Sequence, residues 1–285
     1  MTEKKGKLYI VGTPIGNIQD ITIRALETLK KVDLILAEDT RQTLKLLNHY
    51  EISKRQISYH RHNEADKINQ VKALLDEGKE IALVSDAGMP CVSDPGYLLV
   101  IELVKENYEI EVIPGVTALI TAVVKSGIDT TRFAFEGFLS VNKKQRKERL
   151  TEIKNDKRTL IVYEAPHKIK NTLRDILEML GNRNICIARE LTKIHEEYLR
   201  GTVKELIDYY DTVLPKGEMV IIIEGKTDAE LELEKEKSFE DVTIEELLTK
   251  YINEGLSRKE AVKKAAKDKK MDKNQVYKIC ISLEK

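Results

Sequence analysis

The chain has 285 residues, of which 41% are hydrophobic and 34% charged, and its 48 basic and 48 acidic side chains give a formal net charge of zero. No apolar run approaches the roughly 18 residues of a membrane-spanning helix, and the apolar stretch near the amino terminus is too short for a signal peptide, so we expect a cytoplasmic protein with no membrane partner. The three cysteines form no Cys-x-x-Cys pair, which argues against a disulfide framework or a zinc knuckle.

The first part of the chain alternates short apolar strands with amphipathic helices. We predict strands at residues 8–11, 34–36, 81–84 and 110–113, and helices at 20–31, 40–49, 64–77 and 95–105. The strands are too uniformly apolar to face water, which indicates an α/β lobe with a parallel sheet. Asp20 is the expected N-cap of the first helix.

A second α/β lobe is predicted after Pro114 and Gly115. Its helices should begin with a small-residue segment at 117–125, and its strands should lie at 133–136, 159–163, 185–188 and 219–223. Pro166 suits the first position of a helix that Gly181 ends. Thr202 and Glu205 have the spacing of a capping box, which starts a further helix.

Beyond Gly225 the strand pattern disappears, and a charged linker precedes three short helices. Thr243, Ser257 and Asp272 mark the expected helix starts. The predicted core of this bundle is Leu247, Leu248, Ile252, Leu256, Val262, Ala265, Val276, Ile279 and Leu283. The bundle is similar to a helix-turn-helix nucleic-acid module, and a packing or dimerisation bundle is the alternative. We therefore expect four segments: two lobes at 1–116 and 117–226, a linker at 227–240 and a helical module at 241–285.

Charge is distributed unevenly along the chain. Residues 142–158 carry eight basic and three acidic side chains (+5), residues 230–254 carry three and nine (−6), and residues 255–285 carry ten and four (+6). Solvated helix faces would explain any one block, but two basic blocks favour a polyanionic partner.

The segment from Val84 to Gly96 has the strongest signal of a ligand site. It holds two Asp, two Pro and two Gly directly after an apolar strand. Open α/β sheets bind their ligands at the carboxyl ends of strands, so we predict a ligand-binding loop here. An ordinary turn between a strand and a helix is the alternative.

The loop after the first strand, from Gly12 to Gly16, departs from a dinucleotide signature. Its glycines are four residues apart, and Pro14 removes an amide that a phosphate would use. The Walker lysine pattern is absent as well. These features favour a nucleoside-like ligand without phosphates, and S-adenosylmethionine is such a ligand.

Seven blocks, in this order, resemble the family of 16S ribosomal RNA cytidine 2′-O-methyltransferases, which belongs to the tetrapyrrole methylase-like superfamily. They are residues 11–17, 37–41, 85–96, 113–118, 135–138, 163–167 and 189–193. The resemblance implies two α/β lobes with S-adenosylmethionine in the cleft between them and no metal. It also implies a homodimer that acts on 16S ribosomal RNA of the small ribosomal subunit.

The resemblance further implies which residues hold the methyl donor. The first lobe and the hinge would contribute Pro14, Ser85, Asp86, Ala87, Gly88, Val92, Ser93, Thr117 and Ala118. The second lobe would contribute Tyr163, Glu164, Ala165, Gly217, Glu218 and Met219. In the tetrapyrrole enzymes the loop matched to Ser85-Asp86-Ala87 reads Gly-Asp-Pro, and this chain keeps the Asp.

Methyl transfer to a ribose requires alignment of the two substrates and removal of the hydroxyl proton. Candidates for the base, or for lowering the pKa of the hydroxyl, are Asp39, His60, Glu64 and Lys193. Phosphates of the RNA could be met by Arg41, Arg61 and Arg189. A surface loop around His60 and an ion pair between Asp39 and Arg41 are the structural alternatives.

Two other functions remain open from the sequence. A tetrapyrrole or other small-molecule methyltransferase of the same fold would leave the basic blocks as solvent faces. A non-enzymatic RNA-binding assembly factor would use them without catalysis.

Overall fold

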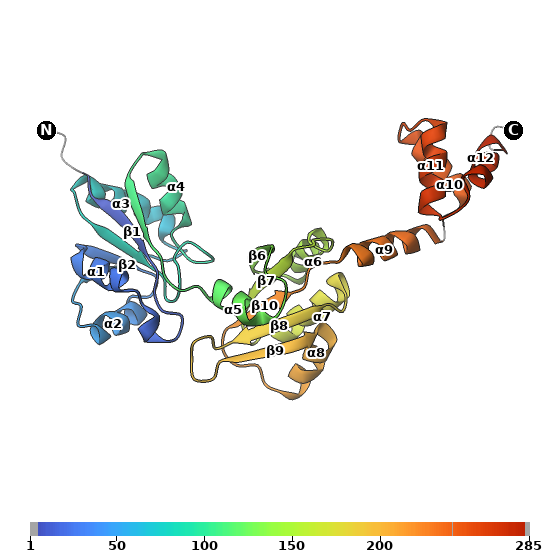
Figure 1. Cartoon of the computed structure of the whole chain (residues 1–285). Helices are drawn as coiled ribbons and strands as arrows, with labels where there is room; N and C mark the ends of the chain where they lie inside the picture. The colour runs from blue at the N-terminus through green and yellow to red at the C-terminus, as the bar shows by residue number, and fades with distance from the viewer. Residues whose placement is uncertain (1–4, 241, 283–285) are drawn as a thin grey trace. The chain divides into compact units, whose positions relative to one another are not determined.

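The computed structural model describes residues 5–240 and 242–282. They form two compact units (Figure 1). The first unit runs to Glu224 and contains both sheets, while the second begins at Gly225 and also takes in Asn155–Lys157. In the described part of the chain, no helix has the length and apolar character needed to cross a membrane.

The first sheet is parallel throughout, as predicted. Its strand order is β3-β2-β4-β1-β5. The strands are β1 (Lys7–Val11), β2 (Leu34–Ala37), β3 (Arg55–Ser58), β4 (Ile81–Val84) and β5 (Glu109–Ile113). All residues of β2 and β4 are buried, because helices cover both faces of the sheet.

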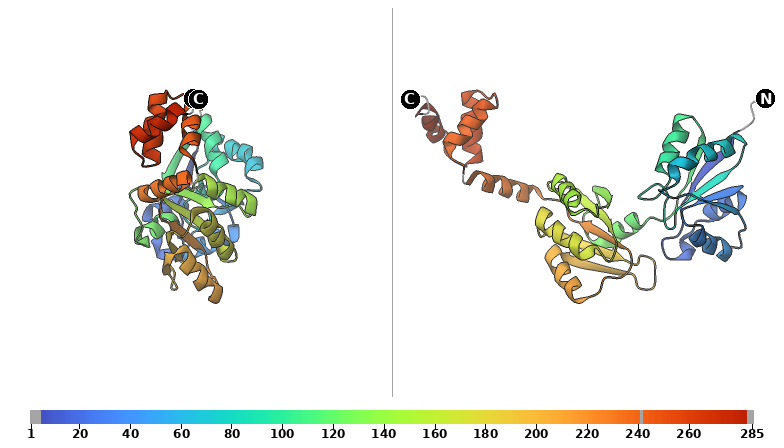
Figure 2. Two further views of the ribbon diagram at one scale, coloured as in Figure 1. Left: turned by 90° about the vertical axis from the view of Figure 1, so that its right-hand side faces the viewer. Right: turned by 180° about the vertical axis from the view of Figure 1, so that it is seen from behind.

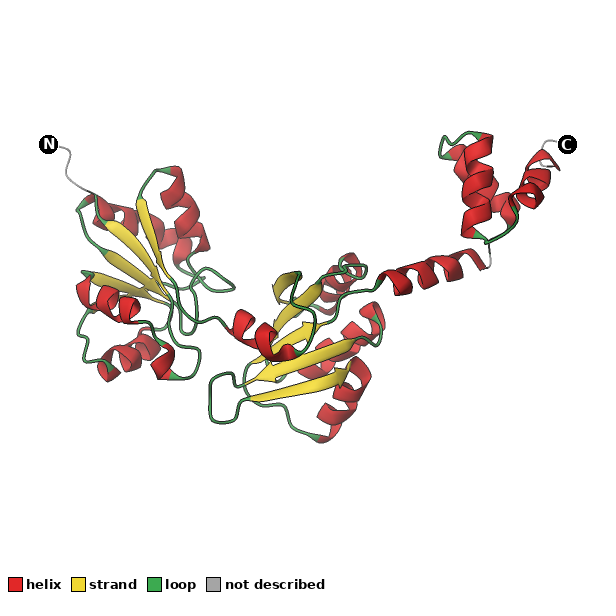
Figure 3. Cartoon of the chain, viewed as in Figure 1, coloured by secondary structure: helices red, strands yellow, loops and turns green. Residues whose placement is uncertain are grey.

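Alternate side chains of these strands pack on different helices, which gives a three-layer arrangement (Figure 3). One face packs against α3 (Glu64–Asp76) and α4 (Tyr97–Lys105). The other face packs against α1 (Ile23–Lys31) and α2 (Thr40–His49). All ligand-binding loops predicted for this lobe therefore leave the sheet at one edge, where its five strands end.

Two predicted helix starts are wrong by a few residues. Asp20 ends a short 3-10 helix, η1 (Ile18–Asp20), and Thr22 caps α1 by accepting a hydrogen bond from the amide of Ala25 at 3.1 Å. Pro166 likewise lies ahead of its helix, α7 (Ile169–Leu180). In both places a tight turn intervenes between the strand-end loop and the helix.

The second sheet is mixed, with the order β6-β7-β10-β8-β9. Only β6 and β7 are parallel, and the other three pairs are antiparallel. The strands are β6 (Phe133–Phe138), β7 (Thr159–Glu164), β8 (Asn184–Arg189), β9 (Glu197–Thr202) and β10 (Met219–Ile223). Strand β9 was not predicted.

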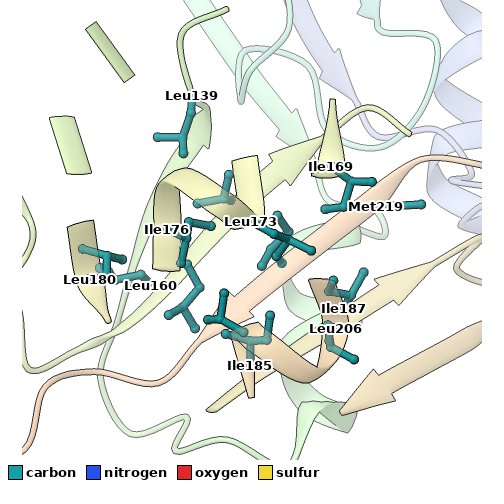
Figure 4. Close-up of a cluster of buried hydrophobic side chains, with 14 of the residues drawn as sticks. Leu139, Leu160, Ile169, Leu173, Ile176, Leu180, Ile185, Ile187, Leu206 and Met219 are labelled. Atoms are coloured by element: carbon teal, nitrogen blue, oxygen red, sulfur yellow. The ribbon is translucent and has the colours of Figure 1, made fainter. Parts of the chain in front are cut away.

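Helices cover both faces of this sheet as well. The larger core packs the sheet against α6 (Lys143–Glu152), α7 and α8 (Val203–Thr212), and includes Leu160, Leu173 and Ile185 (Figure 4). The other face packs against α5 (Ala118–Ser126), which follows directly from the first lobe. Thr202 and Glu205 form the predicted capping box of α8.

The second unit is helical (Figure 2). It contains α9 (Asp228–Glu240), α10 (Ile244–Asn253), α11 (Arg258–Asp268) and α12 (Lys273–Ser282). The segment expected as a charged linker is helical instead, because Thr227 and Glu230 form a reciprocal cap and residues of high helix propensity follow. The predicted starts at Thr243, Ser257 and Asp272 are confirmed.

The core of the module agrees with the prediction in most positions. Five of the nine expected residues are buried, and Leu256 and Ile279 pack at the margin. Ile252 is 37% exposed, because its neighbour Tyr251 takes the inward position. Leu283 lies outside the described residues.

Candidate active site

The loops after β2 and β4 are joined by the Asp86 carboxylate. One of its oxygens accepts a hydrogen bond from the amide of Asp39 at 3.0 Å. In return the amide of Asp86 donates to the Glu38 carboxylate at 3.4 Å. Because β2 and β4 are neighbours in a parallel sheet, the two loops leave the same edge, and these bonds fix Asp86 beside Glu38.

The loops after β1 and β5 touch through glycine. A Cβ atom on Gly12 would lie 2.8 Å from the Cα of Gly115, which is shorter than any tolerable contact. Thr13 also exchanges two backbone hydrogen bonds with Gly88, at 2.9 and 3.0 Å. Thus Pro14, which is half-buried, is held close to the loop that follows β4.

The loop at residues 85–96 is held in a strained shape. Cys91 and Ser93 have φ angles of 71° and 67°, a region that few side chains adopt. Arg61 donates a hydrogen bond to the carbonyl oxygen of Ser93. At the end of the loop the buried Glu64 carboxylate accepts from the amides of Gly96 and Leu98, at 2.9 and 3.0 Å. Asp94 lies between these anchors, which hold the backbone on both sides of it.

Asp94 was not singled out from the sequence, but its surroundings in the folded protein disfavour the ionised carboxylate. Burial, and then the negative charges of Glu38, Asp86 and Glu218, raise its pKa to about 7, while Arg61 opposes the rise. Burial also raises the pKa values of Glu38 and Asp86. None of the described residues donates a hydrogen bond to the Asp94 carboxyl, so its oxygens are available to a ligand.

The other residues of this loop that are expected to hold the methyl donor differ in their exposure to solvent. Ser85 and Gly88 are buried, Ser93 is half-buried, and Ala87 and Val92 are exposed. The Ser85 hydroxyl lies 3.4 Å from the carbonyl oxygen of Ala87. The buried residues shape the loop, and the exposed ones are free to meet a ligand.

Polar contacts hold the residues expected to bind the methyl donor at the junction of the two lobes and at the end of β7. Thr117 caps α5, and Ala118 is the first residue of that helix. The Tyr163 hydroxyl accepts a hydrogen bond from the amide of Leu119 at 3.0 Å. The Glu164 carboxylate is buried and accepts from the amide of Ala165 and the hydroxyl of Thr172. Glu164 therefore serves its own loop, and a ligand would meet the backbone here.

The remaining residues expected to hold the methyl donor, Gly217, Glu218 and Met219, lie just before β10 and at its first position. Gly217 has a φ of 75°, and a Cβ on it would lie 2.3 Å from the Glu190 carboxylate. Glu218 is exposed, whereas Met219 is buried under the hydroxyl of Tyr210. Glu218 is thus the member of this group whose side chain can face a ligand.

Direct contacts bring parts of the two lobes together within the first unit. The amide of Asn17 donates to the hydroxyl of Thr192 at 2.9 Å. A Cβ on Gly137, in β6, would lie 3.1 Å from the hydroxyl oxygen of Ser93. Together with the influence of Glu218 on Asp94, these contacts place second-lobe groups beside the 85–96 loop.

The four predicted base candidates have different partners. Asp39 caps α2 and pairs with Arg41, and these bonds lower its pKa to about 2. Glu64 caps α4, as described above. Lys193 pairs with Glu190 at 3.0 Å. The ring of His60 contacts Asn63, and its Nδ1 is buried with no hydrogen-bond partner among the described residues.

The three arginines expected to meet RNA are all engaged within the chain. The Arg41 side chain is 86% exposed although it pairs with Asp39. Arg61 holds the 85–96 loop, and the half-buried Arg189 pairs with Glu197 at 2.5 Å. Arg41 and Arg61 are exposed to an incoming polyanion, and Arg189 is less so.

The basic block at 142–158 largely serves to stabilise the fold. Arg146 is buried and pairs with Asp175, with 2.6 Å between nitrogen and oxygen. Lys147 pairs with Glu178, and Arg149 pairs with Glu136 and Glu152. Acidic side chains from outside the block, Asp175, Glu178 and Glu136, therefore offset part of its positive charge in the folded protein.

Comparisons with known proteins agree with this geometry. The family model for tetrapyrrole (corrin/porphyrin) methylases matches residues 7–207. A protein named ribosomal RNA small subunit methyltransferase I from Halalkalibacterium halodurans is 47% identical over 277 residues, which cover 97% of this chain and 95% of that relative. A protein of the same name from Thermotoga maritima is 50% identical over 221 residues, which cover 78% of this chain and 99% of that relative.

Solved structures support the same fold at lower identity. The crystal structure of uroporphyrin-III C-methyl transferase from Thermus thermophilus complexed with S-adenyl homocysteine matches with a TM-score of 0.56 and 18% identity. The match covers 78% of this chain and 98% of that chain. At this identity the likeness establishes the two-lobed fold alone.

Proposed function

This chain belongs to the tetrapyrrole methylase family and, within it, to the ribosomal RNA small subunit methyltransferases I, and we propose that it methylates a cytidine 2′-hydroxyl of 16S ribosomal RNA with S-adenosylmethionine. The observation that carries the proposal is the cluster of carboxyl groups in the loops after β2 and β4, formed by Glu38, Asp86 and Asp94. Carboxylates suit the positive sulfonium and the ribose hydroxyls of this donor, whereas they would repel a pyrophosphate.

The residues present fit such a donor. Pro14 takes away an amide that a phosphate would need, and Gly12 and Gly115 allow the backbones at the ends of β1 and β5 to approach closely. The orphaned Nδ1 of His60 and the unengaged carboxyl of Asp94 are polar atoms for which a ligand would supply partners. When bound, S-adenosylmethionine supplies a methyl group on an excellent leaving group.

The protein's own part in the reaction is to align the two substrates, exclude water and accept a proton. We assign the base role to Asp94 in preference to the four residues expected from the sequence. At neutral pH a carboxyl with a pKa of about 7 can accept a proton, whereas Asp39, with a pKa of about 2, is a very weak base. Glu64 is occupied by two amides.

Labelled methyl transfer tests the function. The protein is incubated with tritiated S-adenosylmethionine and either small ribosomal subunits or a tetrapyrrole precursor. We expect label in the 2′-O-methylcytidine of 16S ribosomal RNA after nuclease digestion. Transfer to the tetrapyrrole alone would assign a small-molecule methyltransferase, and transfer to neither would favour the assembly factor.

The variant Asp86→Ala tests the placement of the donor site. It removes the acceptor that joins the β2 and β4 loops, so we expect transfer to be lost and the circular dichroism spectrum to be kept. Asp129→Ala is the matched control, because Asp129 caps a turn at Thr131 in the second lobe, outside the expected donor residues. Equal activity of the two variants would refute the assigned site.

We also propose that the enzyme is a cytoplasmic homodimer. Ile120 and Val124 lie one helical turn apart on α5 and are 47% and 76% exposed. A second copy would cover this apolar face. Sedimentation of the wild-type protein and of Val124→Lys checks this, and a monomeric wild type at micromolar concentration would contradict it.

A further inference from the structure

The helical module contains a hollow of about 560 Å³ between α11 and α12. Its lining combines three basic residues with an amide, an aromatic ring and three apolar or thiol side chains. These residues are Arg258, Lys259, Val262, Lys273, Asn274, Tyr277, Cys280 and Ile281. The volume lies within the range of small-ligand pockets, of about 300 to 1,000 Å³.

The rim of the hollow is positively charged, and among the described residues no acidic side chain lines it. Lys259 and Lys273 make no ion pair with any residue that the structure describes. The nearest acids in sequence are engaged elsewhere: Glu260 accepts hydrogen bonds from Ser257, and Asp272 caps α12. The two lysines are therefore available to an anion.

The wall of the hollow is aromatic and apolar. Tyr277 and Ile281, which both belong to α12, are 55% and 48% exposed. Other side chains of this helix pack in the apolar core of the module. Val262 and Cys280 are buried beneath them. Exposed rings beside cations are the arrangement with which proteins bind single-stranded nucleic acid, because a base stacks on the ring while its phosphate meets the charge.

We propose that this hollow binds one unpaired nucleotide of the RNA substrate. The phosphate contacts Lys259 and Lys273, and the base packs on Tyr277. A single strand fits better than a duplex, because the major groove of A-form RNA is too deep and narrow for side chains to enter. The inference rests on the proposed function for the identity of the RNA and adds a second contact outside the catalytic unit.

Binding of a fluorescent single-stranded RNA to the full-length protein, measured at several salt concentrations, tests the site. We expect the double variant Lys259→Gln/Lys273→Gln to lower the slope of log K against log salt by about 0.7, since the two lysines meet one phosphate and each single-strand phosphate contributes about 0.7. Tyr277→Ala should weaken binding about 5- to 150-fold through lost stacking.

The matched control is Lys250→Gln/Lys263→Gln. It removes the same charge from exposed positions of the module that do not line the hollow. Equal effects of the two double variants, or tighter binding of duplex than of single-stranded RNA by the wild type, would overturn the proposal. Thermal unfolding of each variant shows that the module stays folded.

Methyl transfer to small subunits separates this inference from the proposed function. We expect the Lys259 and Lys273 double variant to raise KM for subunits and to leave kcat unchanged, because the catalytic unit is untouched. If the wild type transfers no methyl group, the proposed function fails whatever the binding data show. A raised KM with unchanged binding to naked RNA would contradict the nucleotide site and point to a protein partner.

Discussion

The role assigned to Asp94 leads to a sharp prediction about pH. With a pKa of about 7, the carboxyl is about one tenth ionised at pH 6 and about nine tenths ionised at pH 8. If the carboxylate accepts the ribose proton, kcat/KM of the wild type rises about tenfold per pH unit below 7 and then levels off. Asp94→Asn removes this limb and lowers kcat/KM by about 10²- to 10⁴-fold.

The charged neighbours of Asp94 make it possible to shift its pKa without removing the base. The pH below which kcat/KM falls, the acidic limb of the profile, should shift with that pKa. Glu38 is the largest charged contributor to the rise in the pKa of Asp94, and Arg61 opposes that rise. Glu38→Gln should therefore shift the limb to lower pH, and Arg61→Gln should shift it to higher pH. A structural role for Asp94 would give neither movement.

The measurement is the initial rate of labelled methyl transfer to small subunits from pH 5.5 to 9, together with calorimetric binding of S-adenosylmethionine. Wild-type rates in Asp94→Asn would refute the assignment. The assignment would also be refuted if the affinity for S-adenosylmethionine fell as much as kcat/KM, because Asp94 would then be a residue that binds the methyl donor.

Stability gives an independent check. A carboxyl with a raised pKa favours the folded state at low pH and loses this contribution as pH rises through 7, and Asp94→Asn should lack that loss.

Three further predictions concern the scaffold. Arg146→Met should lower the free energy of unfolding by about 3–5 kcal/mol in urea titrations, because it leaves Asp175 charged and unpaired in the core; a loss below 1 kcal/mol would contradict this. Gly12→Ala should cost about 1–3 kcal/mol in the same titration and weaken donor binding, because its Cβ would push Gly115 away; an unchanged midpoint would count against the close contact. Cys91 should resist iodoacetamide at pH 8 in mass spectrometry of the native protein, because burial raises its thiol pKa to about 12; rapid native alkylation would refute this.

Much of the fold could be predicted because its signals are local. The buried strands of the first lobe are short apolar runs, and the capping boxes at Thr202, Thr243 and Ser257 each fall within four residues. Strand β9 and helix α6 were missed for the opposite reason. β9 is an edge strand without an apolar run, and α6 has two inward side chains, Arg146 and Leu150, among many charged ones.

The candidate site was only partly predictable. The rule that ligands bind where parallel strands end predicted a ligand-binding loop after β4, and in the structure Asp86 of this loop is bonded to the loop after β2. The pKa of Asp94, however, depends on burial in the folded protein and on carboxylates of two other segments of the chain, at Glu38 and Glu218, as well as on Asp86 of its own loop. No pattern within the 85–96 loop carries that information.

The position of β1 in the first sheet has a consequence for how the chain is made. This strand lies between β4 and β5, although it is synthesised first. Its second neighbour is complete only at Ile113, about 100 residues after Val11, which at typical translation rates is a wait of about 5 to 20 s. Throughout that time the apolar Leu8–Val11 segment has no strand partner on that side. The first sheet can therefore be completed only after β5 has left the ribosome.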